Sequence, residues 1–299
     1  MQTRDRAAFT VPHMTRLPLP ASARARRHPA LTARGRAFDL GRRTYLMGIV
    51  NLTPDSFFED SRKPSPEVAL SHAQRLLAEG ADLLDLGAES TRPGHTAIPF
   101  DEELARLLPA VKALCAACPA PVSVDTTKAS VAAAALEAGA CIVNDQWGLQ
   151  GDPDMARVVR DFGAGLVIMH NQTGTDYAGD LINAIRTFFL RSLDLAARAG
   201  IPESAIVLDP GIGFGKTPGQ NLEVVRRLAE LNDLGLPLLL GASRKSFLGK
   251  ILDLPPEERL EGTLAATTAG IAAGVDIVRV HDVLANARAA KVADAIYRG

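Results

Sequence analysis

The amino-acid sequence predicts an α/β protein built as a single (β/α)8 or TIM barrel. Eight short apolar runs alternate with amphipathic helical stretches from residue 45 onward, and polar residues follow the C-terminal end of nearly every run. The length of 299 residues suits one large domain or two small ones. An open, doubly wound sheet is the alternative. The count of eight runs and the lack of a G-x-G-x-x-G motif after the first run argue against it.

Each apolar run is short and often β-branched, as a strand buried on both faces should be. The predicted strands are residues 45–50, 83–86, 122–124, 141–143, 166–169, 206–208, 238–240 and 277–280. The first helix is predicted to begin at Ser65, with Pro66 in its first turn, and to end at Gly80, because these residues favour helix starts and stops. The other predicted helices are residues 102–117, 128–138, 154–161, 181–199, 221–231, 260–273 and 283–295.

The N-terminal part of the chain differs from the rest. Residues 1–36 hold eight Arg, no Lys and one acid, Asp5, so the remaining 263 residues carry 25 basic and 33 acidic side chains and a net charge of −8. Residues 1–30 are expected to be a disordered basic tail or the product of a misassigned start upstream of Met14, although their composition also resembles a transit peptide. Residues 31–34 and 36–40, around Gly35, predict a hairpin, so the barrel domain is assigned to residues 31–299.

The composition excludes several classes of protein. Hydrophobic residues make up 47% of the chain, which is enough for a sizeable core, and no apolar run approaches the ~18 residues of a membrane span. The acidic body has few aromatic residues, which argues against a nucleic-acid-binding protein based on stacking. Cys115 and Cys118 are expected to be structural. The three cysteines make no disulfide framework and the chain shows no secretory signal, so the reducing cytoplasm is the expected location.

Polar residues follow the predicted strands at the end where a barrel carries its active site. Asp125, Asn144 and Asp209 follow strands three, four and six. Their carboxylate and amide oxygens suit the N–H donors of a flat heterocycle such as a pterin or a purine. Lys245, after strand seven, adds a donor for a carbonyl oxygen or a ring nitrogen of the same ligand.

A second group of polar residues predicts an anion site. Strands one and eight become neighbours when the barrel closes, so Arg279 and His281 are expected beside Asn51. Two potential cations and an amide suit a phosphate or pyrophosphate. Mg2+ is expected with a pyrophosphate, held by one or two protein oxygens and by the phosphates themselves.

Seven motifs resemble those of the dihydropteroate synthase family in order and spacing, and the resemblance covers residues 31–296. The motifs are Asn51-Leu-Thr-Pro-Asp-Ser-Phe57, Glu89-Ser-Thr-Arg-Pro-Gly94, Val124-Asp-Thr-Thr-Lys128, Asn144-Asp145, Asp209-Pro-Gly-Ile-Gly-Phe214, Ser243-Arg-Lys-Ser-Phe247 and Arg279-Val-His-Asp-Val283. The resemblance implies a TIM-barrel enzyme of folate biosynthesis. Such an enzyme joins 6-hydroxymethyl-7,8-dihydropterin pyrophosphate to 4-aminobenzoate and releases pyrophosphate.

The resemblance also implies roles for individual residues. Asp125, Asn144, Asp209 and Lys245 are expected to bind the pterin, while Asn51, Arg279 and His281 hold the pyrophosphate and Asn51 contacts its Mg2+. The catalytic candidates are Asn51, Arg92, Asp125, Lys245, Arg279 and His281. The aminobenzoate pocket, where sulfonamides act, is expected to be lined by Phe57, Thr91, Arg92, Pro93, Phe214, Lys245 and Ser246. Further candidate substrate contacts are Glu59, Met169 and Gly241.

The chain departs from the family pattern in its first loop. Glu59 stands where the family usually carries Asp, and Asp60 follows it, so either residue is a candidate for the loop carboxylate. Two other functions share this barrel: a pterin-binding methyltransferase and a paralogue that binds pterin without turnover. The Arg279-Val-His281 and Ser-Thr-Arg-Pro motifs argue against the methyltransferase. The family is commonly dimeric, so a homodimer is expected by resemblance.

Overall fold

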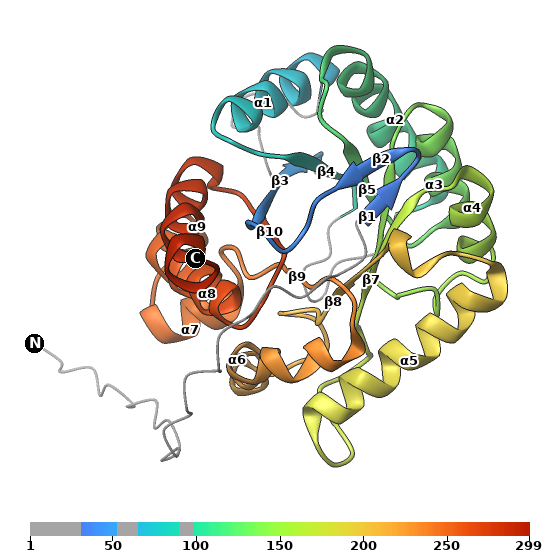
Figure 1. Ribbon diagram of the computed structural model, residues 1–299. Coiled ribbons are helices and arrows are strands. Elements are labelled where there is room, and N and C mark those ends of the chain that lie inside the picture. Colours follow the sequence, from blue (N-terminus) through green and yellow to red (C-terminus); the bar gives the residue numbers. More distant parts are fainter. Residues whose placement is uncertain (1–30, 53–64, 90–97) are drawn as a thin grey trace, which may run out of the picture.

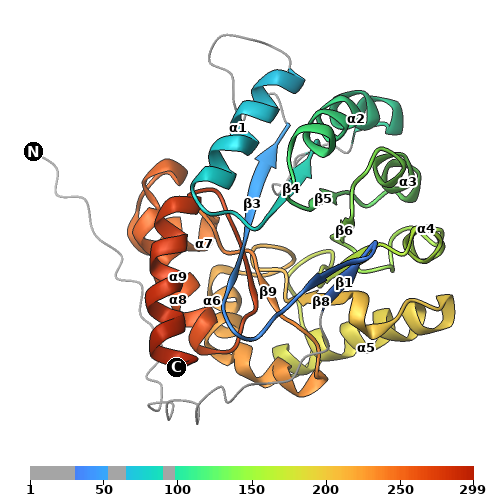
Figure 2. The ribbon, with the colours of Figure 1, turned by 45° about the horizontal axis from the view of Figure 1, so that its top comes forward.

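Eight parallel strands form the centre of the molecule, and helices surround them (Figures 1 and 2). The computed structural model describes residues 31–52, 65–89 and 98–299. The strands hydrogen-bond in the order β8-β7-β6-β5-β4-β3-β10-β9, and a bridge between Leu208 and Leu238 brings β8 beside β9. The sheet therefore closes on itself, which confirms the predicted (β/α)8 barrel.

The barrel strands lie where the apolar runs predicted them. They are β3 (Tyr45–Asn51), β4 (Leu83–Gly87), β5 (Val122–Asp125), β6 (Ile142–Asp145), β7 (Gly165–Met169), β8 (Ile206–Asp209), β9 (Leu239–Leu240) and β10 (Ile277–Val280). Several strands run one or two residues further than predicted, so that Asn51, Asp125, Asn144 and Asp209 belong to the ladder itself. The sheet therefore holds these polar residues more rigidly than a loop would.

Nine α-helices occur in the described residues, one more than predicted. They are α1 (Pro66–Ala78), α2 (Phe100–Ala117), α3 (Ala129–Glu137), α4 (Met155–Phe162), α5 (Leu181–Ala199), α6 (Pro218–Arg227), α7 (Ser246–Leu252), α8 (Leu260–Ala272) and α9 (Val283–Tyr297). The prediction missed α7 because seven residues are too few to show a helical period. It also started α6 three residues late, because Thr217 and Gln220 form a capping box around Pro218. None of the helices in the described ranges is long and apolar enough to cross a bilayer.

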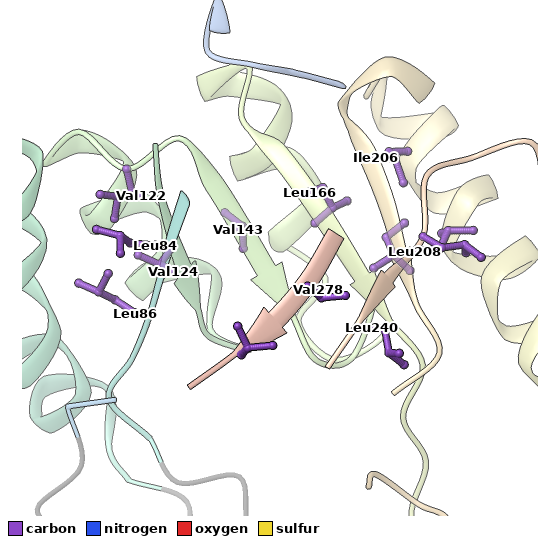
Figure 3. Close-up of a cluster of buried hydrophobic side chains, with 14 of the residues drawn as sticks. Leu84, Leu86, Val122, Val124, Val143, Leu166, Ile206, Leu208, Leu240 and Val278 are labelled. Atoms are coloured by element: carbon purple, nitrogen blue, oxygen red, sulfur yellow. The ribbon is translucent and has the colours of Figure 1, made fainter. Parts of the chain in front are cut away.

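Alternate residues of the strands face the helices and form the main hydrophobic core. Figure 3 shows part of this layer, including Leu84 and Leu86 of β4, Val122 and Val124 of β5, and Leu208 of β8. All five side chains are at most 1% exposed. Burial of this layer between sheet and helices explains why the runs are apolar, and it leaves the intervening residues to fill the interior of the barrel.

A short hairpin covers the N-terminal end of the barrel (Figure 2). Strands β1 (Leu31–Ala33) and β2 (Arg36–Phe38) pair through Arg34 and Gly35, which both have positive φ, 49° and 77°, as a tight hairpin turn requires. The apolar side chains of this hairpin pack against those of Met47, Leu83 and Ile277 near the strand starts. The predicted hairpin is confirmed, and the opposite end of the barrel is left for a site. The predicted tail, residues 1–30, lies outside the described residues.

Candidate active site

The interior of the barrel changes from apolar to polar toward the C-terminal ends of the strands. In β4 the inward-facing residues are Leu83, Asp85 and Gly87, because a strand directs every second residue to the same face. The same change occurs from Ile142 to Asn144 in β6, from Val207 to Asp209 in β8 and from Ile277 to Arg279 in β10. One polar layer thus crosses the barrel and gathers side chains that are up to about two hundred residues apart in sequence.

Arg279 lies within this polar layer and joins two strands. Its Nε donates to Asp85 Oδ2 at 2.6 Å, and its Nη2 donates to Asp125 Oδ2 at 2.9 Å. Only 17% of its side chain is exposed. Burial by itself lowers the pKa of Arg279, but the two carboxylates more than offset this and raise it, so the guanidinium stays charged. The guanidinium of Arg279 thus lies against two carboxylates inside the barrel rather than at the open end of the barrel.

Asp125 ends β5 with a carboxyl group that can change charge near neutral pH. Its Oδ1 accepts a hydrogen bond of 2.6 Å from Gln146 Nε2. Burial is the main cause that raises the pKa of Asp125 to about 7, while the opposite charge of Arg279 lowers it and the like charge of Asp85 raises it further. Asp125 can therefore accept or donate a proton toward a heterocycle that reaches the end of the barrel.

Asn144 carries a buried oxygen that no described residue satisfies. It lies opposite Asp125 in the β5–β6 ladder and is only 4% exposed. Its Nδ2 donates to Asp85 Oδ2 at 3.1 Å, whereas its Oδ1 has no hydrogen-bond partner in the described part of the chain. A buried carbonyl oxygen without a partner costs about 1–3 kcal/mol. A ligand N–H that donates to this oxygen would supply the missing hydrogen bond.

Asp209 ends β8 beside a tight glycine turn. Its Oδ1 accepts a hydrogen bond of 2.8 Å from the Gly211 N–H, and burial is the main cause that raises its pKa. Gly211 has a φ of +67°, and a Cβ there would lie 1.9 Å from the His170 carbonyl oxygen, so only glycine fits. Lys216 ties the turn together, because its Nζ donates to the carbonyl oxygens of Gly211 and Phe214, each at 3.0 Å, and lies 2.8 Å from His170 Nδ1.

Lys245 reaches across to the same turn. Its Nζ donates to the Ile212 carbonyl oxygen and lies 4.2 Å from the centre of the Phe214 ring. Gly213 makes room for it, since a Cβ at Gly213 would lie 2.8 Å from Lys245 Cδ. Burial is the main cause that lowers the pKa of Lys245 to about 8. The next residue, Ser246, is exposed at the start of α7. Phe214, Lys245 and Ser246 thus lie close together at the edge of the mouth.

Asn51 and His281 line one cavity of about 400 Å³, which extends toward α1 and α9. Arg279 does not line this cavity, because its guanidinium lies against Asp85 and Asp125. Burial lowers the pKa of His281 to about 3, and Arg279 contributes to the shift, so the imidazole is neutral. The structure therefore brings Asn51 and His281 together as expected. Of the two expected cations, only Arg279 is charged, while Arg75, Arg244 and Arg288 also line the cavity.

Ser243 contacts His281 twice. The Ser243 Oγ accepts the backbone N–H of His281 at 3.2 Å and lies 2.9 Å from His281 Nδ1. When the hydroxyl donates to Nδ1, the proton of the neutral ring lies on Nε2. A neutral imidazole of this kind offers one N–H donor to an anion.

The described residues contain no group of three or more His, Cys, Asp or Glu that could hold a metal ion.

The remaining candidates are placed less centrally or are not described. Met169 ends β7 and is 4% exposed, and Gly241 lies so near Asp209 that a Cβ on it would be 3.6 Å from Asp209 Oδ2. The candidates that lie outside the described residues are Phe57, Glu59, Thr91, Arg92 and Pro93.

Three residues of the polar layer were missed by sequence analysis. Asp85 stands inside an apolar run, Leu83-Leu84-Asp85-Leu86-Gly87, Ser123 stands inside the next one, and Gln146 follows the Asn144-Asp145 pair. Asp85 could have been recognised as a residue of the barrel interior. It lies two residues before Gly87, and a strand directs residues two apart to the same face. Lys216 was not among the predicted site residues, whereas the structure gives it a role in holding the glycine turn.

Comparisons with known proteins agree with this geometry. The sequence pattern of a family described as pterin binding enzymes matches residues 47–281. The dihydropteroate synthase of Clostridium beijerinckii is 46% identical over 265 residues, which cover 87% of this chain and 97% of that protein.

Two solved structures are similar over nearly their whole length. The dihydropteroate synthase of Clostridium difficile in the presence of pteroic acid has a TM-score of 0.86 at 52% identity and covers 88% of this chain and 100% of that one. The dihydropteroate synthase of Xanthomonas albilineans in complex with 7,8-dihydropteroate has a TM-score of 0.83 at 38% identity and covers 90% and 98%. With the barrel, the polar layer and the matched pattern in agreement, this chain belongs to the dihydropteroate synthase family of pterin-binding enzymes.

Proposed function

We propose that this chain condenses 6-hydroxymethyl-7,8-dihydropterin pyrophosphate with 4-aminobenzoate to give 7,8-dihydropteroate and pyrophosphate. Its relatives are dihydropteroate synthases, and two similar structures were solved with pteroic acid and with 7,8-dihydropteroate. The observation that carries the proposal is the unsatisfied Asn144 Oδ1 between the acidic ends of β5 and β8. This arrangement supplies acceptors at the place where a pterin presents N–H donors.

The pterin half is assigned to four residues. Asp125, Asn144 and Asp209 offer oxygens to the amino group and ring N–H groups, and all three face the barrel interior at the ends of their strands. Lys245 supplies a donor beside them for a ring nitrogen or the carbonyl oxygen. Because these groups are largely buried, each hydrogen bond to the ligand is stronger than it would be in water.

The pyrophosphate half is assigned to Asn51, His281 and Arg279. Asn51 and His281 line the same cavity, and Arg279, two residues before His281, belongs to the polar layer. Mg2+ fits this arrangement, because Asn51 offers one carboxamide oxygen and the ion commonly takes its other ligands from phosphates and water. When bound, Mg2+ would neutralise charge on the leaving pyrophosphate.

The reaction needs little more than orientation and charge stabilisation from the protein. The bond between the pterin methylene carbon and the pyrophosphate oxygen breaks, and its electron pair leaves with the pyrophosphate. The electron-rich ring stabilises the resulting carbocation, with the carboxylates of Asp125 and Asp209 nearby. The amine nitrogen of 4-aminobenzoate then bonds to that carbon and releases its proton to solvent, so no covalent protein intermediate is required.

The proposal is tested by incubating the protein with the pterin pyrophosphate, 4-aminobenzoate and Mg2+, and by measuring dihydropteroate and pyrophosphate together. Equimolar formation of both products supports it. A protein that binds the pterin but forms no dihydropteroate is a non-catalytic paralogue. Transfer of a methyl group from methyltetrahydrofolate, with no dihydropteroate formed, supports the methyltransferase instead. Omission of Mg2+ in a parallel reaction tests the metal assignment separately.

A further inference from the structure

Asp85 is a fully buried carboxylate in the middle of a barrel strand. It is 0% exposed and occupies the third position of the five-residue strand β4. A buried ionised carboxylate is unfavourable unless hydrogen bonds and an opposite charge compensate it. Three side chains do so here. Ser123 Oγ donates to Oδ1 at 2.6 Å, while Arg279 Nε and Asn144 Nδ2 donate to Oδ2 at 2.6 and 3.1 Å.

The bond from Asn144 determines which end of its carboxamide is available. A carboxylate only accepts hydrogen bonds, so the amide nitrogen of Asn144 must face Asp85. The amide oxygen is then turned away from Asp85, and it is the buried atom that no described residue satisfies. With a neutral amide at position 85 the opposite orientation would become accessible, and Asn144 could offer a donor where a pterin also offers a donor.

The bonds from Arg279 determine the direction of its guanidinium. Nε is held by Asp85 and Nη2 by Asp125, two carboxylates on neighbouring strands. Two contacts to a planar group fix its plane. No described residue accepts a hydrogen bond from Nη1 of Arg279. Asp85 therefore orients both a pterin acceptor and a cation, although it is buried beneath them.

We propose that Asp85 is a positioning residue for the pterin pyrophosphate: it orients the carboxamide of Asn144 as an acceptor and the guanidinium of Arg279 as a donor. This inference rests on the proposed function, because it assigns the orphan oxygen of Asn144 to the pterin. A purely structural role for Asp85 would predict lost stability without a selective loss of ligand binding. The two roles therefore differ in a measurable way.

The test compares Asp85→Asn with Ser123→Ala. Both residues are 0% exposed, and both substitutions remove hydrogen bonds from the same carboxylate group. Ser123 contacts Oδ1 only, so its removal leaves the Oδ2 bonds to Asn144 and Arg279 in place. The Kd for pteroic acid, the kcat and the unfolding midpoint in urea are measured for each variant at one pH.

The positioning role predicts that Asp85→Asn weakens pteroic acid binding by about tenfold to a hundredfold, as expected for a mismatched buried hydrogen bond. It also predicts that kcat falls, because Arg279 loses its fixed direction. Ser123→Ala is expected to keep its Kd within about twofold while losing stability. If Asp85→Asn binds pteroic acid as the wild type does, or if both variants lose affinity in proportion to lost stability, the inference is wrong. A wild-type protein that binds no pteroic acid would refute the proposed function instead.

A second variant keeps the test decisive if Asp85→Asn does not fold. The double variant Asp85→Asn with Asn144→Asp exchanges the carboxylate and the carboxamide. Asn at position 85 can then donate to Asp at position 144, which still offers an acceptor oxygen to the ligand. The same amide nitrogen cannot accept from Arg279 Nε, so kcat is expected to stay low while pteroic acid binding recovers. Recovered folding with pteroic acid binding supports the positioning role. A double variant that folds but binds no better than Asp85→Asn, or not at all, overturns it.

Discussion

The stability of this protein is predicted to depend on pH through Lys216, which is 8% exposed beside the candidate active site. Burial is the main cause that lowers the pKa of its ammonium group to about 7 from an ordinary 10.5, and Asp209 only partly counteracts this. Between these two values the unfolded chain holds a proton that the folded chain has released. Stability must therefore rise with pH across this window and be lower below pH 7, where both states are protonated.

The size of the effect follows from the same two values. One proton of difference corresponds to about 1.4 kcal/mol per pH unit. Because the folded group is half titrated near pH 7, the contribution of Lys216 grows by about 2 kcal/mol between pH 7 and pH 9. In the Lys216→Met variant this contribution is absent. Met cannot make the hydrogen bonds of Lys216, and the variant therefore loses a fixed amount of stability. This loss does not change between pH 7 and pH 9, because burial lowers the pKa of His170 to about 3 in the wild type, far below this range.

The assay is urea unfolding of the wild type and Lys216→Met at half-unit steps from pH 7 to pH 9. The quantity compared is the difference between their free energies of unfolding, so that groups common to both proteins cancel. Lys250→Met is the matched control, because Lys250 is exposed on α7 and its loss should leave the two curves parallel. A wild-type to Lys216→Met difference that stays constant within about 0.5 kcal/mol across this range would refute the reasoning, since it means that the buried ammonium is not destabilised.

Three further outcomes are expected. Asp209→Asn should abolish detectable pteroic acid binding while the protein stays folded, because half of a carboxylate edge becomes a donor; a Kd within threefold of wild type would remove Asp209 from the pterin site. Gly211→Ala should destabilise the fold by about 3 kcal/mol or more in urea, because its Cβ would lie 1.9 Å from the His170 carbonyl oxygen; a loss below about 1 kcal/mol would show that the turn can move. Asn51→Ala should slow pyrophosphate release and raise the Mg2+ concentration needed for activity. Pteroic acid binding should stay unchanged, because that ligand has no phosphate. Equal losses of activity and of pteroic acid binding would place Asn51 at the pterin.

Much of the fold could be predicted because its signals are local. The apolar strands, the Ser65-Pro66 helix start and the turn at Gly35 each depend on a few neighbouring residues. Where the signal was weak, prediction failed. Helix α7 was missed, because its seven residues are too few to show a helical period.

The location of the candidate site could also be predicted, since polar residues end the strands of a parallel barrel at one mouth. Asp125, Asn144, Asp209 and Lys245 were recognised in this way, and the structure brings them to that mouth. The charge states of the site residues could not be predicted from the sequence. The pKa of Asp125 is raised to about 7 by burial, and His281 is neutral because burial lowers its pKa to about 3. Both shifts depend on surroundings that the strands assemble from distant parts of the chain.

The barrel, the family motifs and the set of polar strand ends could be predicted, because they follow from composition and spacing along the chain. The pairing of those polar groups emerges only in the folded chain. Asp85 and Arg279 are 194 residues apart and meet at 2.6 Å, and the same carboxylate turns the amide of Asn144. The physical reason is that hydrogen bonding and desolvation act between neighbours in space, and closing the barrel makes neighbours of residues that no sequence pattern connects.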